Sequence, residues 1–268
     1  MLRFGQEYKE LFARIEDLLL SAENGSLAYT KFLTPAEALC VKKILPQKGI
    51  EKRACFLGGY TGAERVRLVI LPSYLDGYDE NAPELLAQYF PEEADSLVRA
   101  VKITGSGYKI LSHRDYLGSI LGLGVERDAV GDIVVHDTRE AYAFVSDSIA
   151  ALMLDSLEYV GSDKVKLCLA SIDPSHVFER EFVRINDTVA SSRFDCVVSS
   201  LTRLSRDKAK SLIDSGMCQH NYIEETRLDI KVAPEDIITV RGHGKFIIRE
   251  LTDKTKKGRL RLIADKHV

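Results

Sequence analysis

Apolar residues recur at helical intervals near the start of the chain. In residues 3–24 they lie three or four positions apart, which predicts a helix with one face against a core. A second helix begins after Thr34, which has the character of an N-cap and forms a capping box with Glu37. Residues 54–71 contain two strand-like runs joined by a glycine-containing turn. The pattern predicts a small N-terminal α/β domain over residues 1–72.

The middle of the chain alternates between strand and helix patterns. Their order is βαββαβ, the split arrangement that ferredoxin-like and RNA-recognition (RRM) folds share, and we assign it to a domain over residues 73–180. No strand carries the aromatic pattern flanked by Lys/Arg-Gly-Phe, so any RNA contact here is expected to be atypical. The segments are residues 97–104, 113–124, 131–136, 141–146, 146–160 and 164–171.

The last third of the chain opens with two short helical patterns, within residues 191–216. Ser192 is the expected N-cap of the first helix, with Asp195 completing a capping box, and Ser205 is the expected N-cap of the second. Gly216 is the expected left-handed terminator. Strand-like segments follow at residues 217–220, 237–240, 245–251 and 259–263. A third domain over residues 181–268 is therefore predicted to be a helix pair followed by a small β-structure, and the whole chain to be of the α+β class.

Composition adds a charge asymmetry to this picture. The 268 residues are 45% hydrophobic and 29% charged, as in ordinary globular proteins, and the five cysteines form no CxxC pair. That cysteine usage is typical of reduced thiols in a cytoplasmic protein, and no apolar run is long enough to span a membrane. From Val183 onward there are 17 basic and 12 acidic residues (net +5), against 20 and 28 before it (net −8). A basic C-terminal third in an otherwise acidic chain indicates a nucleic-acid partner.

The basic residues concentrate around the second of the two C-terminal helices. At about 100° per residue, Arg206 and Lys210 lie on one flank of its apolar stripe and Lys208 on the other. A solvated charged face is the alternative interpretation. Glycine-flanked Arg241 and Lys245, and the basic run near the C-terminus, extend the candidate surface. The predicted RNA-binding residues are Arg193, Arg203, Ser205, Arg206, Lys208, Lys210, Arg241, Lys245, Lys257 and Arg259.

Several of these motifs together resemble a known family. "SSRFDCVVSSLTRLSRDKAKSLIDSG", followed by a short strand and Asn221, resembles the opening of the S4 RNA-binding domain. Phe194 stands where that family usually has leucine, "MCQHNY" departs from its Val-x-Val-Asn strand, and "PED" stands where Gly-Asp is common. "FLTPAEA", "LGGYTGAERVR", "SHRDYLGSILGLGVERDAVGDI", "VRGHGKF" and "TKKGR" extend the resemblance to the YlmH family of bacterial S4-domain proteins.

The YlmH resemblance implies a function. It implies a non-enzymatic, ribosome-associated protein that contacts rRNA and tRNA on the large ribosomal subunit, in rescue or quality control of stalled translation. It implies neither a cofactor nor a small-molecule substrate. A link to cell division is also attached to the family, so an adaptor protein is one alternative. An RNA-modifying enzyme with an appended S4 domain is the other.

Other chemistry receives little support. The six histidines lack metal-ligand spacing, which predicts no metal site. Ser112, His113 and Asp115 lie on one helical turn and cannot form a catalytic triad. His113 and Arg114 are either a secondary RNA contact at a helix start or part of its capping structure.

Overall fold

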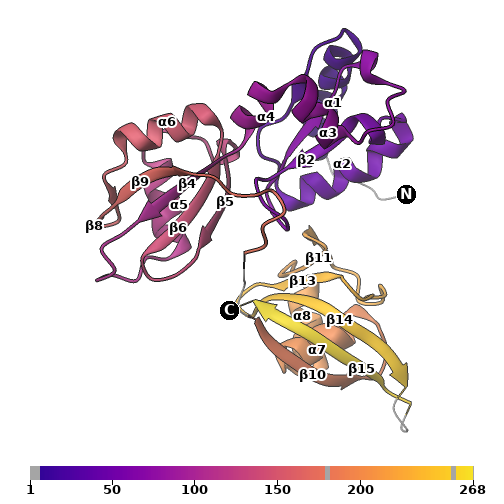
Figure 1. The fold of residues 1–268 in the computed structure, drawn as a ribbon. Coiled ribbons are helices and arrows are strands. Elements are labelled where there is room, and N and C mark those ends of the chain that lie inside the picture. The colour runs from indigo at the N-terminus through magenta and orange to yellow at the C-terminus, as the bar shows by residue number, and fades with distance from the viewer. Residues whose placement is uncertain (1–6, 179–181, 255–257, 268) are drawn as a thin grey trace. The chain divides into compact units, whose positions relative to one another are not determined.

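The computed structural model describes residues 7–178, 182–254 and 258–267. Contacts between Cα atoms divide the chain into two compact units, Met1–Phe178 and Glu179–Val268. Both units mix helices with antiparallel sheets, so the predicted α+β class is confirmed (Figure 1).

The first part of the N-terminal unit is a small sheet with helices on both faces. Thr34 and Glu37 form the predicted capping box, in which the Glu37 carboxylate accepts the Thr34 N–H at 2.7 Å. One face of the sheet buries Leu68 and Ile70 against the first two helices. The elements are α1 (Glu7–Glu23), β1 (Ala28–Tyr29), α2 (Pro35–Lys48), η1 (Glu51–Arg53), β2 (Ala54–Leu57) and β3 (Arg67–Ile70), with strand order β1-β3-β2.

The acidic stretch that follows packs on the other face of this sheet. It forms η2 (Ser73–Leu75), α3 (Ala82–Tyr89) and α4 (Pro91–Leu97). Leu85 and Leu86 of α3 are buried with Val69 of β3, while the carboxylates of the stretch remain exposed. Residues 73–97, placed with the middle domain from the sequence, therefore share a core with β2 and β3. The reason is that their few apolar side chains cover the face of this sheet on which α1 and α2 do not pack.

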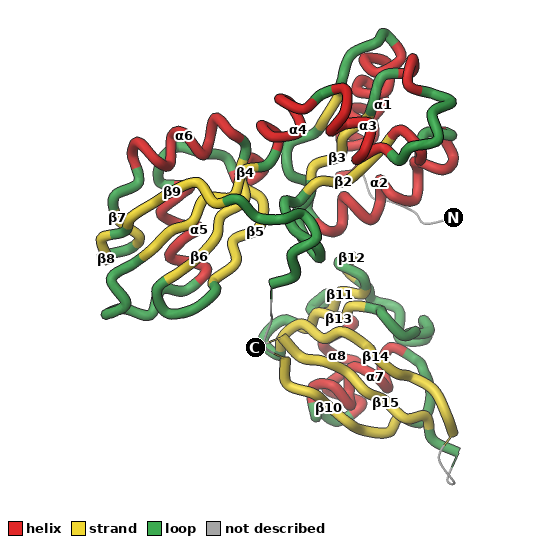
Figure 2. Tube along the Cα trace, viewed as in Figure 1, coloured by secondary structure: helices red, strands yellow, loops and turns green. Residues whose placement is uncertain are grey.

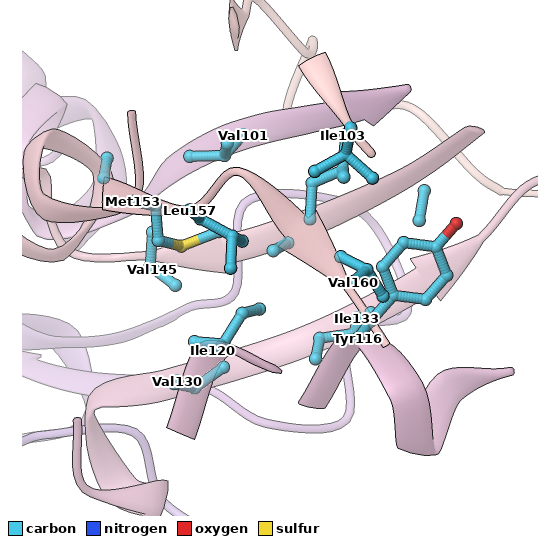
Figure 3. Close-up of a cluster of buried hydrophobic side chains, with 14 of the residues drawn as sticks. Val101, Ile103, Tyr116, Ile120, Val130, Ile133, Val145, Met153, Leu157 and Val160 are labelled. Carbon is cyan, nitrogen blue, oxygen red and sulfur yellow. The ribbon is translucent and has the colours of Figure 1, made fainter. Parts of the chain in front are cut away.

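A four-stranded sheet forms the rest of the N-terminal unit. Its strand order is β5-β6-β4-β9, with every neighbouring pair antiparallel. Side chains of both helices meet the same face of the sheet in one core, in which Tyr116 and Met153 are fully buried (Figure 3). The elements are β4 (Arg99–Thr104), α5 (His113–Leu121), η3 (Arg127–Ala129), β5 (Val130–Val135), β6 (Glu140–Val145), α6 (Asp147–Ser156) and β9 (Lys166–Ala170).

The second helix that packs on this sheet, α6, is shorter than the sequence predicts. It was expected to reach residue 160, but α6 ends at Ser156, and β7 (Tyr159–Val160) pairs with β8 (Asp163–Lys164). Gly161, with φ +58°, takes the left-handed conformation that the hairpin turn needs. Val160 is buried in the sheet core, so tertiary packing outweighs the helical pattern there.

The glycine-rich segment after β2 joins the two sheets of the N-terminal unit. Asp132 of β5 accepts hydrogen bonds from the Tyr60 hydroxyl and the Glu64 N–H, both at 2.7 Å. Gly59 has φ +87°, and a Cβ there would lie 2.4 Å from a ring carbon of Phe144. The "LGGYTG" motif is therefore needed for close backbone approach to the second sheet.

The C-terminal unit is a six-stranded antiparallel sheet with two helices packed on it (Figure 2). Val197 and Val198 of the first helix, with Ala209 and Ile213 of the second, are buried against the strands. The elements are β10 (Phe182–Val189), α7 (Phe194–Thr202), α8 (Arg206–Asp214), β11 (Cys218–His220), β12 (Ile223–Glu224), β13 (Ile237–Val240), β14 (Gly244–Lys254) and β15 (Leu260–His267), in the order β10-β15-β14-β13-β11-β12.

The long edge strand β10 was not predicted. It pairs with β15 over its whole length, from Phe182↔His267 to Val189↔Leu260. Only Val189 of its eight residues is buried, so the strand lacks the alternating burial from which a half-buried strand is recognised. Its existence depends on a partner about 80 residues further along the chain.

Candidate nucleic-acid interface

The two helices of the C-terminal unit begin in different ways. Ser205 caps α8 as predicted, its hydroxyl accepting the Lys208 N–H at 3.4 Å, and Gly216 after the helix is left-handed at φ +71°. The expected Ser192 cap of α7 is wrong, because Arg193 occupies the N-cap position and supplies no side-chain cap. Asp195, expected to complete that capping box, binds two arginines instead.

Asp195 is a buried carboxylate between those arginines. Its Oδ1 lies 3.0 Å from Arg193 Nε, and its Oδ2 lies 3.1 Å from Arg206 Nη2. Burial opposes ionisation, but the hydrogen bond from Arg193 and the two positive charges outweigh it, so the pKa of Asp195 lies below its ordinary value. Arg206 also approaches Cys196 Sγ at 2.8 Å. The carboxylate thus orients both guanidinium groups, whose side chains remain 45% and 60% exposed.

Arg203 lies in the turn between the two helices, in a conformation that is unusual for its residue type. It is the C-cap of α7 with φ 57° and ψ 30°, and its N–H is directed to the carbonyls of Ser199 and Ser200. Left-handed backbone costs a residue with a Cβ on the order of 1–2 kcal/mol, and glycine is the usual occupant of such a cap. Among the described residues no carboxylate is in ion-pair contact with Arg203. An unpaired arginine at a position that favours glycine indicates a role other than folding.

Three of the predicted cations line one cavity of about 480 Å³. Arg203 lies between the two helices and Arg206 begins α8, while Arg259 immediately precedes β15 and donates to the Thr188 carbonyl. The remaining polar lining includes the hydroxyls of Thr188, Ser199 and Ser200 and the carboxylate of Asp187. Ser199 and Ser200 donate their hydroxyl protons to the Leu204 carbonyl and to Asp187, so guanidinium groups are the main donors that this cavity offers to phosphate oxygens.

Arg203 also lines a smaller neighbouring cavity of about 260 Å³, together with His243 and Lys266. Lys266 lies against the backbone of Gly244, where a Cβ would be 2.9 Å from its Cε. Neither His243 nor Lys266 was predicted from the sequence. The positive charge of Lys266 is the only signal that could have identified it, since its position depends on the pairing of β15 with β14.

The other predicted residues lie outside these two cavities. Lys208 and Lys210 are exposed on α8, and Arg241 is exposed in the turn between β13 and β14. Lys245 Nζ lies 4.8 Å from the centre of the Tyr222 ring, in cation–π geometry. Lys257 lies outside the described residues.

A side-chain network orders the loops at the far edge of the sheet. The Asn221 amide donates to Asp236 Oδ1 at 2.8 Å, and its oxygen accepts the Ile237 N–H at 2.9 Å. His220 Nε2 lies 2.8 Å from the second oxygen of Asp236. Glu235 has φ 67°, a left-handed conformation, at the point where "PED" replaces the more common Gly-Asp. The network accounts for a structural role of Asn221 and Asp236.

His113 and Arg114 lie in the first turn of α5, where Ser112 and Asp115 form a capping box. The Asp115 carboxylate accepts both the N–H and the hydroxyl of Ser112 at 2.7 Å, so a carboxylate already occupies this helix start. Partial burial of the ring lowers the pKa of His113, and the positive charge of Arg127 lowers it further. A histidine that resists protonation is a poor phosphate ligand, which favours the capping interpretation over an RNA contact.

Two other kinds of site find no support in the part of the chain that the structure describes. No group of three or more His, Cys, Asp or Glu side chains is placed to hold a metal ion. No described helix is both long and apolar enough to cross a bilayer.

Comparisons with known proteins show what the chain is similar to. Residues 91–173 match the family model described as "Putative RNA-binding domain in YlmH". The chain is 28% identical over 241 residues to the ribosome-associated protein quality control protein P2 of Bacillus subtilis, a match covering 90% of this chain and 87% of that protein. It also matches the solved structure of the cell division protein YlmH from Streptococcus pneumoniae with a TM-score of 0.49 and 20% identity, over 63% of this chain and 94% of that one.

The fold is that of an α+β protein in which one region is similar to the putative RNA-binding domain of YlmH. The resemblance to the YlmH family that the sequence motifs indicate is confirmed.

Proposed function

We propose that the chain is a ribosome-associated RNA-binding protein and that its C-terminal unit is an S4 RNA-binding domain. In this proposal it contacts rRNA and tRNA on the large ribosomal subunit in the cytoplasm, during quality control of stalled translation. The name of the Bacillus subtilis relative and the matched RNA-binding domain support the ribosomal and RNA parts. The observation that carries the assignment to this unit is the cation-lined cavity around Arg203.

The arrangement of charges favours RNA backbone as the ligand. Arg203, Arg206 and Arg259 come from separate elements but converge on one cavity. Asp195 holds Arg206 in place, which reduces the side-chain entropy lost when a phosphate binds. Affinity is expected to come from contacts with phosphates, and selectivity from RNA shape.

The proposal keeps the three-part organisation with one change. Residues 181–268 form the S4 domain, and the four-stranded sheet forms the RRM-like domain. The boundary between the first two domains moves from residue 72 to near Val98, because α3 and α4 pack on the first sheet. We infer a binding role rather than a catalytic one.

Salt-dependent binding tests the proposed surface. The full chain is titrated with purified large ribosomal subunits between about 50 and 200 mM salt, as the wild type and as Arg206→Ala with Lys210→Ala. Each lost phosphate contact should make the slope of log K against log salt shallower by about 0.7–0.9. The matched control is Lys43→Ala with Lys52→Ala, which removes the same charge from exposed positions of the N-terminal unit and should leave the slope unchanged.

Three outcomes would contradict the proposal. An unchanged slope for the folded Arg206 and Lys210 double variant removes those residues from the interface. Failure of the wild-type chain to cosediment with large subunits removes the ribosomal role and leaves the adaptor interpretation. Modified nucleosides detected by mass spectrometry after incubation with rRNA or tRNA would identify an RNA-modifying enzyme instead.

A further inference from the structure

The face of the four-stranded sheet opposite α5 and α6 is covered by other segments of the chain. Phe144 of β6 is fully buried beneath Tyr60 and Phe178, whose ring centres lie 4.8 and 6.0 Å from its own. Tyr142, on the same face, contacts Phe178 at 5.3 Å. RNA-recognition folds stack bases on aromatic side chains of this face. Here those rings are engaged inside the protein, so the matched RNA-binding region needs another contact surface.

One end of this sheet gathers three chain segments. Thr104, the last residue of β4, pairs with Glu140 on one side and with Lys166 on the other. The loop after β4, the turn between β5 and β6, and the β7–β8 hairpin therefore emerge at the same end. We call this end the loop tip and define it as residues 105–111, 136–140 and 159–166.

Internal contacts fix the shape of the loop tip. The buried carboxylate of Asp163 accepts the Ser106 N–H at 2.9 Å and its hydroxyl at 2.6 Å. Hydrogen bonds from Ser106 hold the pKa of Asp163 below its usual value, so the Asp163 carboxylate stays charged. The Gly105 N–H donates to the Arg139 carbonyl at 2.7 Å, and the Arg139 side chain lies on Gly107. The three segments are joined before any ligand binds.

The anchored loop presents a tyrosine to solvent. Tyr108 is 96% exposed, and nearby Ile110 and Tyr159 are 85% and 50% exposed. Tyr108 lies between Ser106 and Lys109, both of which bond to the β7–β8 hairpin. A large ring held fully exposed on a fixed loop is a stacking platform rather than part of the core.

The charges of the loop tip favour an anionic ligand. Lys109, Arg139, Lys164 and Lys166 are all exposed. They outnumber its three carboxylates, which are charged but oriented by internal contacts: Asp163 bonds to Ser106, Glu140 to Lys102 at 2.6 Å, and Asp137 to the backbone N–H groups of residues 139 and 140. The loop tip therefore carries a small excess of positive charge, although the unit as a whole is acidic.

We propose that the loop tip binds unpaired nucleotides of single-stranded RNA. Tyr108 stacks on a base, and Lys109, Arg139 and Lys164 contact the neighbouring phosphates. This inference rests on the proposed function, because it takes RNA as the ligand of the chain, and it adds a second contact in the other unit. A ring beside cations is the combination that single-stranded nucleic acid binds without needing a base-specific pattern.

Photo-crosslinking tests the loop tip directly. The full chain is incubated with an oligouridine of about 12 nucleotides that contains 4-thiouridine, irradiated, digested with trypsin and mapped by mass spectrometry. We expect crosslinks in the tryptic peptide of residues 103–109, which contains Tyr108.

Tyr108→Ala should weaken oligouridine binding about fivefold or more in a fluorescence titration, and Tyr108→Phe should retain it, because stacking needs only the ring. Tyr74→Ala removes a 59% exposed tyrosine elsewhere in the unit and should change nothing.

The failures of the two proposals are distinguishable. If the wild type binds oligouridine but residues 103–109 are not crosslinked and Tyr108→Ala binds normally, the loop-tip proposal is overturned and the RNA-binding function stands. If the wild type binds neither oligouridine nor large ribosomal subunits, both proposals fall. If Tyr108→Ala loses subunit binding but keeps the affinity of the wild type for oligouridine, the loop tip contacts protein and the RNA proposal is wrong.

Discussion

Replacing Arg203 with glycine should separate folding from RNA binding. Arg203 has φ 57° at the end of α7, so its Cβ is in a left-handed conformation that costs about 1–2 kcal/mol. Glycine removes that cost but adds backbone entropy to the unfolded chain, which offsets part of the gain. We expect the free energy of unfolding of Arg203→Gly to rise by roughly 0.5–1 kcal/mol, measured by urea titration of the full chain.

The same substitution removes a cation that lines both cavities of the C-terminal unit. Loss of one phosphate contact should make the log–log salt slope for ribosomal subunits shallower by about 0.7–0.9. Arg203→Ala is the matched variant, because it removes the same charge and retains the left-handed Cβ. It should bind as weakly as Arg203→Gly without the gain in stability.

Two results would refute this reasoning. An Arg203→Gly variant less stable than the wild type would show that the arginine side chain stabilises the turn by more than the left-handed backbone costs. A salt slope equal to that of the wild type would show that Arg203 touches no phosphate. The glycine and alanine variants together therefore measure the conformational cost and the binding contribution independently.

Two further predictions concern other residues of the C-terminal unit. Glu235→Gly should be more stable than Glu235→Ala by about 1 kcal/mol in urea unfolding, because the φ of residue 235 is 67° and only glycine adopts it without cost. Both variants lose the exposed ion pair to Arg249, so the comparison isolates the backbone. Equal stabilities would contradict a conformational cost. Asp195→Asn should lower the free energy of unfolding by roughly 1–2 kcal/mol at pH 7, since Asp195 is buried but its arginine partners are partly exposed. The folded-state pKa of Asp195 is lowered from 3.8, so its ion pairs stabilise the fold above about pH 4 and are lost as pH falls through the lowered value. The stability difference from Asp195→Asn should thus be constant near neutral pH and shrink below about pH 4, and a difference that persists at lower pH would assign it to packing instead.

Local signals in the sequence were reliable where the chemistry is local. Thr34 with Glu37, Ser205, and Gly216 are caps or terminators whose partners lie within about one helical turn, and the structure shows each of them in place or in the expected conformation. The same logic failed for Ser192 and Asp195. There a capping-box pattern is present, but Arg206 from the next helix binds the carboxylate.

The candidate site was only partly accessible from the sequence. Residue type and clustering identified Arg203 and Arg206, which lie three residues apart, and the charge of the C-terminal run identified Arg259. The convergence of Arg259 on the same cavity requires the pairing of β15 with β10, an edge strand that has no burial pattern. The loop tip was not predicted at all, because Tyr108 is one exposed tyrosine among many until Asp163 fixes its loop.

The sequence by itself determined several helix starts and ends, the apolar faces, the order of strands and helices around the middle sheet, and the concentration of positive charge in the last third of the chain. These features depend on neighbours within a few residues or on composition. The tertiary structure alone decided which sheet α3 and α4 cover, which arginines Asp195 binds, and which cations share a cavity. Those outcomes depend on contacts between residues far apart in the chain, whose free energies exceed local preference and leave no periodic signal in the sequence.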